Sequence, residues 1–296
     1  EGKGYPLIRT PNIGKGRLKF DGVHRVSEQV YNQRNERAVP QAGDLILARE
    51  APVGNVAIIR QGQQVCLGQR TVLIKPNKKY VDPDFLVYYL LSPELQHKLL
   101  SSSNGATVSH LNMSSIRSLE VQVPGIDVQK RIGAILARID DKIELNAAIN
   151  ENLELQAQAI FKSWFVDFEP FGGVMPVDWN VGAFSDVADV LSGKRPPMKQ
   201  NDKTEDASIP LIGAAAIMGY TNKFNHDDKI LVIGRVGTHG IVQRFDYPCW
   251  TSDNTLVIKS NYYEYTYQIL KLIDYKAMNR GSTQPLITQG DLKKTE

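Results

Sequence analysis

Short stretches of the sequence bring reactive residue types together, and each can be compared with the spacing that a known chemistry requires. Segment 234–240 is rich in glycine, but it has neither the spacing nor the Lys-Ser/Thr ending of a phosphate-binding P-loop. The one Pro-Pro pair, at 196–197, lacks the preceding Asn or Asp and the following aromatic residue with which an adenine amino-methyltransferase holds its target amino group. Neither stretch predicts an active site.

Histidines, carboxylates and thiols support acid–base, metal or nuclease chemistry only at suitable spacing. Segment 202–206, Asp-Lys-Thr-Glu-Asp, has the composition of a nuclease site, but it lies in a polar stretch typical of a solvated loop. Cys66 and Cys249 belong to no CxxC pair, so we expect reduced strand residues and no zinc site. The histidines form no HExxH pair and stand apart, at His24, His97, His110, His226 and His239. We therefore predict no catalytic residue, no metal and no cofactor.

Hydrophobic periodicity in the first part of the chain predicts short strands followed by helices. Apolar, β-branched runs predict strands over 44–48, 56–59 and 71–75, and strict alternation predicts another over 119–124. Segment 83–100 has helical spacing, interrupted by Ser92-Pro93. A polar loop and a short helix are expected between residues 105 and 117.

A single long helix is expected next, from an N-cap at Asp127 to Glu169-Pro170, with Gly133 as its one glycine. About forty residues would span about 60 Å. Steps of four and three residues define a heptad seam of Ile132, Leu136, Ile139, Ile143, Asn146, Asn150, Leu153, Ala157, Ile160 and Trp164. The two asparagines either fix the register of a partner helix or face solvent. The apolar seam needs another helix, from this chain, a second copy or another protein.

The two ends of the chain are related by an internal repeat. Segments 5–8, 45–54, 66–75 and 104–111 resemble 209–212, 230–237, 249–259 and 280–287, in the same order and with small insertions. The long helix follows the first copy. The sequence therefore predicts an α+β fold of two similar domains, 1–125 and 171–296, separated by a coiled-coil helix over 126–170. Relative to a full two-fold repeat, we expect both ends of the chain to be truncated.

Composition limits the classes of partner and compartment. The net charge is +3, with the cationic excess in the first domain, which permits a polyanionic partner. No apolar run is long enough for a membrane span, and the first residues lack the apolar run of a signal peptide. Two unpaired thiols fit a reducing compartment, so we expect a cytoplasmic protein without membrane contact.

The repeat and the helix ending at 160–170, Ile-Phe-Lys-Ser-Trp-Phe-Val-Asp-Phe-Glu-Pro, resemble the specificity subunits of type I restriction–modification enzymes. The loops Gly105-Ala106-Thr107 and Gly281-Ser282-Thr283-Gln284 are also similar to that family's. The resemblance implies two target-recognition domains, each reading half of a bipartite double-stranded DNA site. It also implies docking of two methyltransferase subunits, which would carry S-adenosylmethionine. A restriction or translocase subunit would be a further partner.

DNA-reading residues are expected on polar, glycine-containing loops, because base edges and phosphates need donors and acceptors held on structured turns. In the first copy these candidates are Arg9, Asn12, Lys15, Arg17, Arg49, Asn55, Thr107, Ser109 and His110. In the second copy they are Arg235, Thr238, His239, Arg280, Ser282, Thr283 and Gln284. Like loops stand at like positions of the repeat while their side chains differ, as two readers of different half-sites require.

Three functions remain open at this point. The leading one is a non-catalytic DNA-recognition subunit. The second is the specificity part of a single-chain methyltransferase or nuclease, whose catalytic motifs would lie outside this sequence. The third is a coiled-coil scaffold that binds protein, through the long helix or by self-association.

Overall fold

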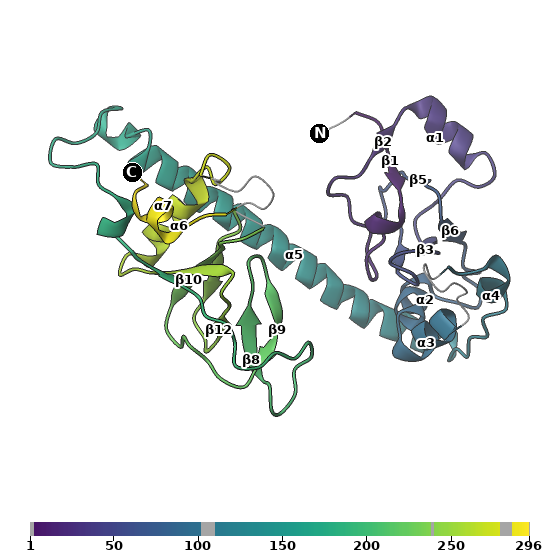
Figure 1. Ribbon diagram of the computed structural model, residues 1–296. Coiled ribbons are helices and arrows are strands. Elements are labelled where there is room, and N and C mark those ends of the chain that lie inside the picture. Colours follow the sequence, from purple (N-terminus) through teal and green to yellow (C-terminus); the bar gives the residue numbers. More distant parts are fainter. Residues whose placement is uncertain (1–2, 102–109, 238–239, 279–285, 296) are drawn as a thin grey trace. The chain divides into compact units, whose positions relative to one another are not determined.

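The computed structural model describes residues 3–101, 110–237, 240–278 and 286–295. The chain divides into two compact units, Glu1–Asn150 and Glu151–Glu296. The boundary falls inside one uninterrupted helix, α5 (Ile126–Phe165), so residues 126–150 of the helix belong to the first unit and residues 151–165 to the second (Figure 1). We refer to these as unit 1 and unit 2.

In the described part of unit 1, the chain forms two small sheets and four helices besides α5. In the first sheet, β1 (Tyr5–Ile8) pairs antiparallel with β2 (Arg25–Val26) and parallel with β5 (Cys66–Leu67). In the second, β3 (Leu45–Ala48) lies between β4 (Val56–Ile58) and β6 (Thr71–Ile74), both antiparallel to it. The helices are α1 (Glu28–Asn35), α2 (Pro83–Leu90), α3 (Pro93–Ser101) and α4 (Met113–Arg117), with a 3-10 turn at Thr10–Asn12.

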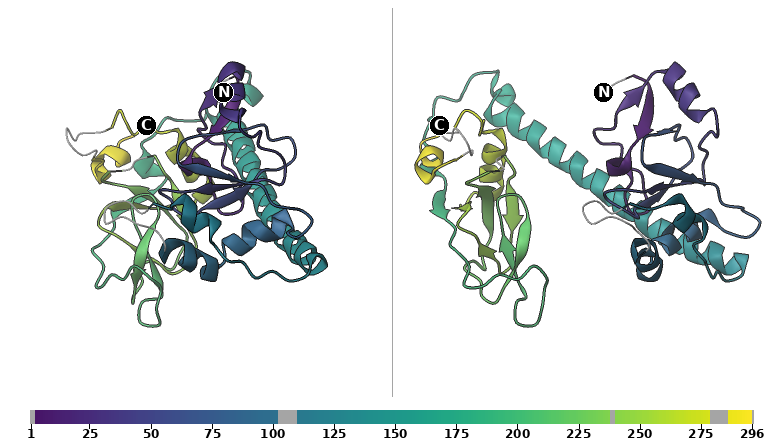
Figure 2. Two further views of the ribbon diagram at one scale, coloured as in Figure 1. Left: turned by 90° about the vertical axis from the view of Figure 1, so that its right-hand side faces the viewer. Right: turned by 45° about the vertical axis from the view of Figure 1, so that its right-hand side comes forward.

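Among the described residues, unit 2 repeats the strand arrangement of unit 1 and adds β7. β8 (Ile209–Ile212) pairs antiparallel with β9 (Ile217–Thr221) and parallel with β12 (Trp250–Thr251). β10 (Ile230–Gly234) lies between β11 (Gln243–Phe245) and β13 (Thr255–Lys259), and β13 also pairs with β7 (Asp189–Ser192). Its helices are α6 (Tyr263–Leu272) and α7 (Gln289–Lys293), with 3-10 turns at Glu169–Phe171 and Phe184–Asp186. Figure 2 shows α6 against the sheet of β10 and β13, where the two elements share a buried core.

The two units have the same strand order and the same mixture of parallel and antiparallel pairs. The repeat is therefore real, but its register differs from the sequence alignment by one residue in two blocks. Because Leu45 pairs with Ile74 and Leu231 pairs with Ile258, the equivalent of Leu45 is Leu231, not Ile230. The parallel partner of Leu7 is Cys66, whereas that of Leu211 is Trp250, so Cys66 corresponds to Trp250 and not to Cys249. A comparison of sequences cannot see hydrogen-bond partners, and strands of similar apolar residues slip easily by one position.

The expected strands and the helix break at Ser92-Pro93 are confirmed, but the expected strand over 119–124 is wrong. That segment is irregular in the structure and mostly exposed. Alternation alone does not make a strand: the backbone also needs a neighbouring strand to pair with, and Pro124 has no N–H to offer.

Both cysteines are free and buried, with Cys66 in β5 and Cys249 in an isolated bridge with His226.

The long helix is confirmed, with different ends. It begins at Ile126, so Asp127 lies in the first turn and is not the N-cap; its carboxylate there still complements the helix dipole. It ends at Phe165, before the expected Glu169-Pro170, because the chain turns into the left-handed conformation at Phe168 (φ 54°). The Lys162 carbonyl accepts hydrogen bonds from the amides of Val166 and Asp167 at this end.

The most buried positions of α5 in each unit lie outside the predicted heptad seam. In unit 1 the buried positions are Gln129, Gly133 and Ala137, spaced by four residues. In unit 2, Phe161 is buried and stacks near Phe165 and Tyr265, with ring centroids 5.0–5.3 Å apart. Most of the seam's large apolar side chains stay 38–61 % exposed, namely Ile132, Ile139, Ile143, Leu153, Ile160 and Trp164. Leu136 is half-buried, and Asn146, Asn150 and Ala157 are exposed.

Within the described residues, no helix is both long and apolar enough to cross a membrane.

Candidate DNA interface at equivalent ends of the two units

Two of the predicted contact residues of unit 1, Arg49 and His110, meet where β3 ends and β6 begins. Arg49 follows β3 directly, and its amide donates to the carbonyl of Arg70 in the turn before β6 (2.9 Å). The Arg49 carbonyl accepts from the amide of Leu111, which leads into α4 (2.9 Å). Two loops distant in sequence are thereby tied to one strand end. At the neighbouring end of β1, the amide of Gly68 donates to the Ile8 carbonyl (2.7 Å), which places Arg9 beside this group.

A network of side chains holds the Arg49 guanidinium in place. Its Nε donates to the carbonyl of Leu111 (2.8 Å), and its Nη2 lies 2.6 Å from Nε2 of His110. Because an arginine guanidinium can only donate, Nε2 of His110 accepts this hydrogen bond. Nδ1 of His110 therefore carries the ring hydrogen and donates a hydrogen bond to Oε1 of Glu50 (3.1 Å). Glu50 also pairs with Arg70 (2.7 Å). The network leaves Arg70 64 % exposed at the surface of the strand end.

Loop 9–17 meets the same region, but its polar residues divide into two groups. Arg9 and Lys15 are exposed, whereas Asn12 is buried and Nδ2 of its side chain donates to the Lys19 carbonyl. Asn55 donates to the Ile13 carbonyl (2.9 Å), which ties the loop to the turn after β3. Asn12 and Asn55 therefore shape the loop in this structure, while Arg9 and Lys15 are free to meet a ligand.

Arg17 faces α5 and is only 13 % exposed. Its guanidinium contacts three carboxylates of the helix: Asp141, Glu144 (3.3 Å) and Asp140 (3.8 Å). Tyr88 on α2 donates to Asp140 from the other side (2.8 Å). Burial and the nearby Asp141 and Asp140 raise the pKa of Glu144, and burial with the Asp140 contact raises the pKa of Tyr88. The structure thus gives Arg17 a partner inside unit 1; its contact with DNA stays a prediction.

Unit 2 presents the same arrangement with different side chains. Arg235 follows β10, its amide donates to the Asn254 carbonyl (2.8 Å), and its carbonyl accepts from Ile287 (3.0 Å). Arg235 thus corresponds to Arg49. Its Nε is buried and, within the described part of the chain, forms no hydrogen bond. The remaining predicted contacts lie outside the described residues: Thr107, Ser109, Thr238, His239, Arg280, Ser282, Thr283 and Gln284.

This arrangement offers a surface that could bind a ligand. Among the residues that the structure describes, no group of three or more His, Cys, Asp or Glu could hold a metal ion. Exposed cations stand on turns that are fixed by backbone hydrogen bonds, as recognition of phosphates and base edges requires.

Comparison with known proteins decides the family. The profile of the type I restriction modification DNA specificity domain matches residues 1–155 and again 176–296. The chain belongs to this family. Its two matched segments agree with the two units that share one topology, and with the resemblance inferred from the sequence.

Individual members of the type I specificity family share parts of the chain. The MjaIX specificity subunit of Methanocaldococcus jannaschii is 29 % identical over 202 residues, which are 64 % of this chain and 46 % of that protein. The HindI specificity subunit of Haemophilus influenzae is 43 % identical over 101 residues, 33 % of this chain and 22 % of that one. The chain thus spans less than half the length of these relatives.

A solved specificity subunit has the same fold. The type I restriction–modification S subunit from M. genitalium aligns with 99 % of this chain and 80 % of its own, with a TM-score of 0.56 and 16 % identity. At this identity the likeness concerns the fold alone.

Glu50 and Arg70, which complete the unit 1 network, were not predicted from the sequence. The repeat could have revealed Arg70, because this residue lies in the turn directly before one of the matched strands.

Proposed function

We propose that this chain is the sequence-specific DNA-recognition subunit of a type I restriction–modification complex. One observation carries the proposal: Arg49 and Arg235 stand at equivalent strand ends of two units with one topology, and different side chains surround them. Two such readers fit a bipartite target whose halves differ in sequence. Half-sites one helical turn apart, about 34 Å, lie within the reach of a spacer helix of about 60 Å.

The chain itself contributes recognition, and catalysis belongs to its partners. Two adenine methyltransferase subunits would supply the reaction, with S-adenosylmethionine as their cofactor and a flipped-out adenine as their substrate. Restriction and translocation subunits are further expected partners. A complex of this kind acts on double-stranded DNA in the cytoplasm. If the chain is instead the specificity part of a single-chain enzyme, the recognition role is unchanged and the catalytic motifs lie in another segment.

The exposed seam of α5 supports a protein partner as well. Ile139, Ile143 and Leu153 are 51–61 % exposed, and apolar residues at heptad spacing gain most from burial against another helix. A second copy of this chain or a methyltransferase helix would cover them. If the chain acted only as a protein-binding scaffold, it would bind its partner through this seam and would make no contact with DNA.

Methylation sequencing tests the proposal. The chain is expressed with its methyltransferase partner, and modified adenines are mapped with and without exchange of residues 171–296 for those of another specificity subunit. One half of the methylated motif should change and the other half should stay. An unchanged motif after the exchange would refute the recognition role and leave the scaffold.

A further inference from the structure

The loop between β7 and β8 begins with an arch that is fixed at both ends. At its start, the Lys194 amide donates to the Thr251 carbonyl (2.9 Å), and the Trp250 indole donates to the Lys194 carbonyl (2.7 Å). At its end, Gln200 exchanges two backbone hydrogen bonds with Tyr220 (2.8 and 2.9 Å). The Pro196-Pro197 pair restricts the backbone between these points. The arch, residues 195–199, is therefore held in place before any ligand arrives.

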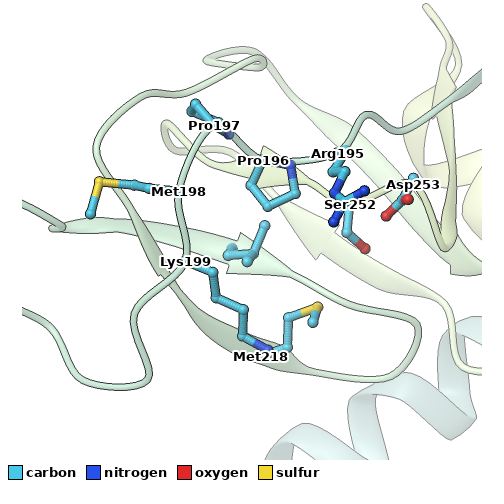
Figure 3. Close-up of a pocket in the computed structure, with 9 residues that line it drawn as sticks. Arg195, Pro196, Pro197, Met198, Lys199, Met218, Ser252 and Asp253 are labelled. Atoms are coloured by element: carbon cyan, nitrogen blue, oxygen red, sulfur yellow. The ribbon is translucent and has the colours of Figure 1, made fainter.

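A pocket of about 490 Å³ lies beneath the arch. Its walls are residues 195–199, Leu211, Met218, Ser252 and Asp253. Figure 3 shows Arg195, Ser252 and Asp253 gathered at one end of the pocket, with Lys199 and Met218 lying away from them. The lining thus combines two cations, one carboxylate, one hydroxyl and an apolar wall. Neither cation forms an ion pair with a residue that the structure describes.

Ser252 points to a ligand for this pocket. Its side chain is almost fully buried, at 2 % exposure, and its hydroxyl has no hydrogen-bond partner among the described residues. A buried hydroxyl without a partner is unfavourable, so such a group in a pocket lining marks a position that a ligand can satisfy. Its backbone, by contrast, is fully used: its amide donates to Ile212 and its carbonyl accepts from Thr255.

The equivalent position of unit 1 is closed. Gly68 corresponds to Ser252, because the Gly68 amide donates to Ile8 as the Ser252 amide donates to Ile212. A Cβ on Gly68 would lie 2.9 Å from Cγ of Arg9, so Arg9 fills the space that a side chain would need. In unit 2, Gly213 stands where unit 1 has Arg9. At this shared backbone position, unit 1 therefore has no room for a side chain, whereas unit 2 carries Ser252.

The pocket adjoins the candidate DNA interface of unit 2. Ser192 pairs with Leu256 and Gly234 with Thr255, so β7 and β10 end, and β13 begins, at one end of the sheet. The arch follows β7 and Asp253 precedes β13. The next residue, Asn254, accepts the hydrogen bond from the amide of Arg235. The pocket and Arg235 thus belong to one continuous surface.

We propose that this pocket is a second DNA contact of unit 2 and sets part of its sequence preference. Arg195 and Lys199 bind backbone phosphates, while Ser252 and Asp253 hydrogen-bond a base edge and Met218 offers an apolar contact. Hydroxyl and carboxylate groups are suited to base edges, and lysine and arginine to phosphates. The inference rests on the proposed function and adds specificity residues to it.

Four variants test the pocket in the complex reconstituted with methyltransferase subunits. The double variant Arg195→Ala, Lys199→Ala should weaken duplex binding about tenfold and lower the salt dependence of the affinity, as loss of phosphate contacts does. Asp253→Asn and Ser252→Ala should change base preference in one half of the methylated motif only. Gly213→Arg should imitate the closed position of unit 1 and have the same effect. Lys271→Ala, an exposed cation on α6 outside the pocket, is the matched control and should leave all these measurements unchanged.

The outcomes separate this inference from the proposed function. If the complex with the unchanged chain methylates no defined motif, the proposed function fails. If the complex with the unchanged chain methylates a defined motif, and the pocket variants keep both that motif and the affinity, the pocket inference alone is overturned. It is also overturned if the variants impair assembly with the methyltransferase in size-exclusion chromatography while assembled complexes bind DNA normally. Thermal melting of each variant shows whether the fold is intact.

Discussion

Arg49 and Arg235 occupy the same position in two copies of one domain, 186 residues apart in sequence by their numbers and identical in their backbone hydrogen bonds. Each donates its amide to the turn before the last strand, at 2.9 and 2.8 Å, and each accepts from the segment that leads into the following short helix. Their side chains differ in surroundings: that of Arg49 is held by Leu111 and His110, and Nε of Arg235 has no partner among the described residues. The same backbone arrangement thus carries two arginines in different side-chain surroundings.

Arg235→Ala should weaken specific DNA binding by the assembled complex without destabilising unit 2. Loss of one arginine contact to a base edge costs about 1–3 kcal/mol in specific binding and relaxes the motif at one position. The fold should be unaffected, because Nε of Arg235 makes no hydrogen bond to a described residue. Binding to target and mismatched duplexes, measured by fluorescence anisotropy, checks the first point, and thermal melting checks the second. Equal affinity of the variant for the target duplex would remove Arg235 from the interface.

Arg17→Ala should loosen the contact between loop 14–17 and α5. The guanidinium is 13 % exposed and contacts three carboxylates, which would be left facing one another. Loss of a charged hydrogen-bonded contact of this kind costs about 1–3 kcal/mol. Urea unfolding followed by circular dichroism should show this loss. Hydrogen exchange should quicken at the amides of Gly16 and Ile58, which link the loop to β4. Lys15→Ala, at the exposed neighbouring residue, is the control and should leave both measurements unchanged.

Much of the fold follows from local patterns, and the errors arise where a distant partner decides. The β-branched runs form β3, β4 and β6 as predicted, because β-branched side chains fit the pleated surface of a buried or half-buried strand. Residues 119–124 alternate just as well, yet no strand pairs with them. The heptad seam of α5 was visible in sequence, whereas its contact with unit 1 was not. That contact uses Gln129, Gly133 and Ala137, whose types carry little hydrophobic signal.

The candidate site shows the same division. The repeat located the turns that carry Arg49 and Arg235, since equivalent turns follow equivalent strands. The repeat does not predict that Asn12 is buried or that Arg17 faces α5. Both facts depend on contacts with residues that are distant in sequence or belong to another element. Ser252 was missed for a related reason. A serine in a polar turn has no signal of its own, and its meaning comes from the burial of its unpartnered hydroxyl in the lining of a pocket.

Gly133→Ala should destabilise the contact between α5 and α2, against the trend expected from helix propensity. A Cβ at this position would lie 2.6 Å from the Phe85 amide nitrogen and 2.8 Å from Oδ1 of Asp82. The backbone of α2 cannot yield as a flexible side chain would, so the helices must move apart. In a free helix the same change would stabilise by about 1 kcal/mol.

The sign of the change in unfolding free energy therefore decides the prediction for Gly133→Ala. Chemical denaturation of the variant and of the unchanged chain gives this value. Ala134→Gly, at an exposed position one residue on, reports the propensity effect alone and should destabilise by about 1 kcal/mol. A stabilised Gly133→Ala variant would show that α5 does not approach α2 this closely.

The stability of unit 2 should fall as the pH drops below the ordinary range of histidine, and His226 should account for part of this fall. Burial, and secondly the charge of Lys259, lower the pKa of His226 below its model-compound value of 6.5. Below pH 6.5 the unfolded chain takes up a proton at this residue before the folded chain does. Protonation thus favours unfolding, and the loss grows until the pH reaches the lowered pKa of the folded state. Well above pH 6.5 both states are unprotonated at this residue, which then contributes no slope.

His226→Gln removes this titration, so the decline in melting temperature between pH 7.5 and about 5 should become shallower than in the unchanged chain. Tryptophan fluorescence is the suitable probe, because all three tryptophans, Trp164, Trp179 and Trp250, lie in unit 2. Asp228 acts in the same direction at its own, lower range: the hydrogen bond from Lys259 lowers the pKa of Asp228, so its stabilising contribution is lost only in more acidic solution. An equal slope in the variant and the unchanged chain would show that His226 is protonated as readily in the folded state as in the unfolded one.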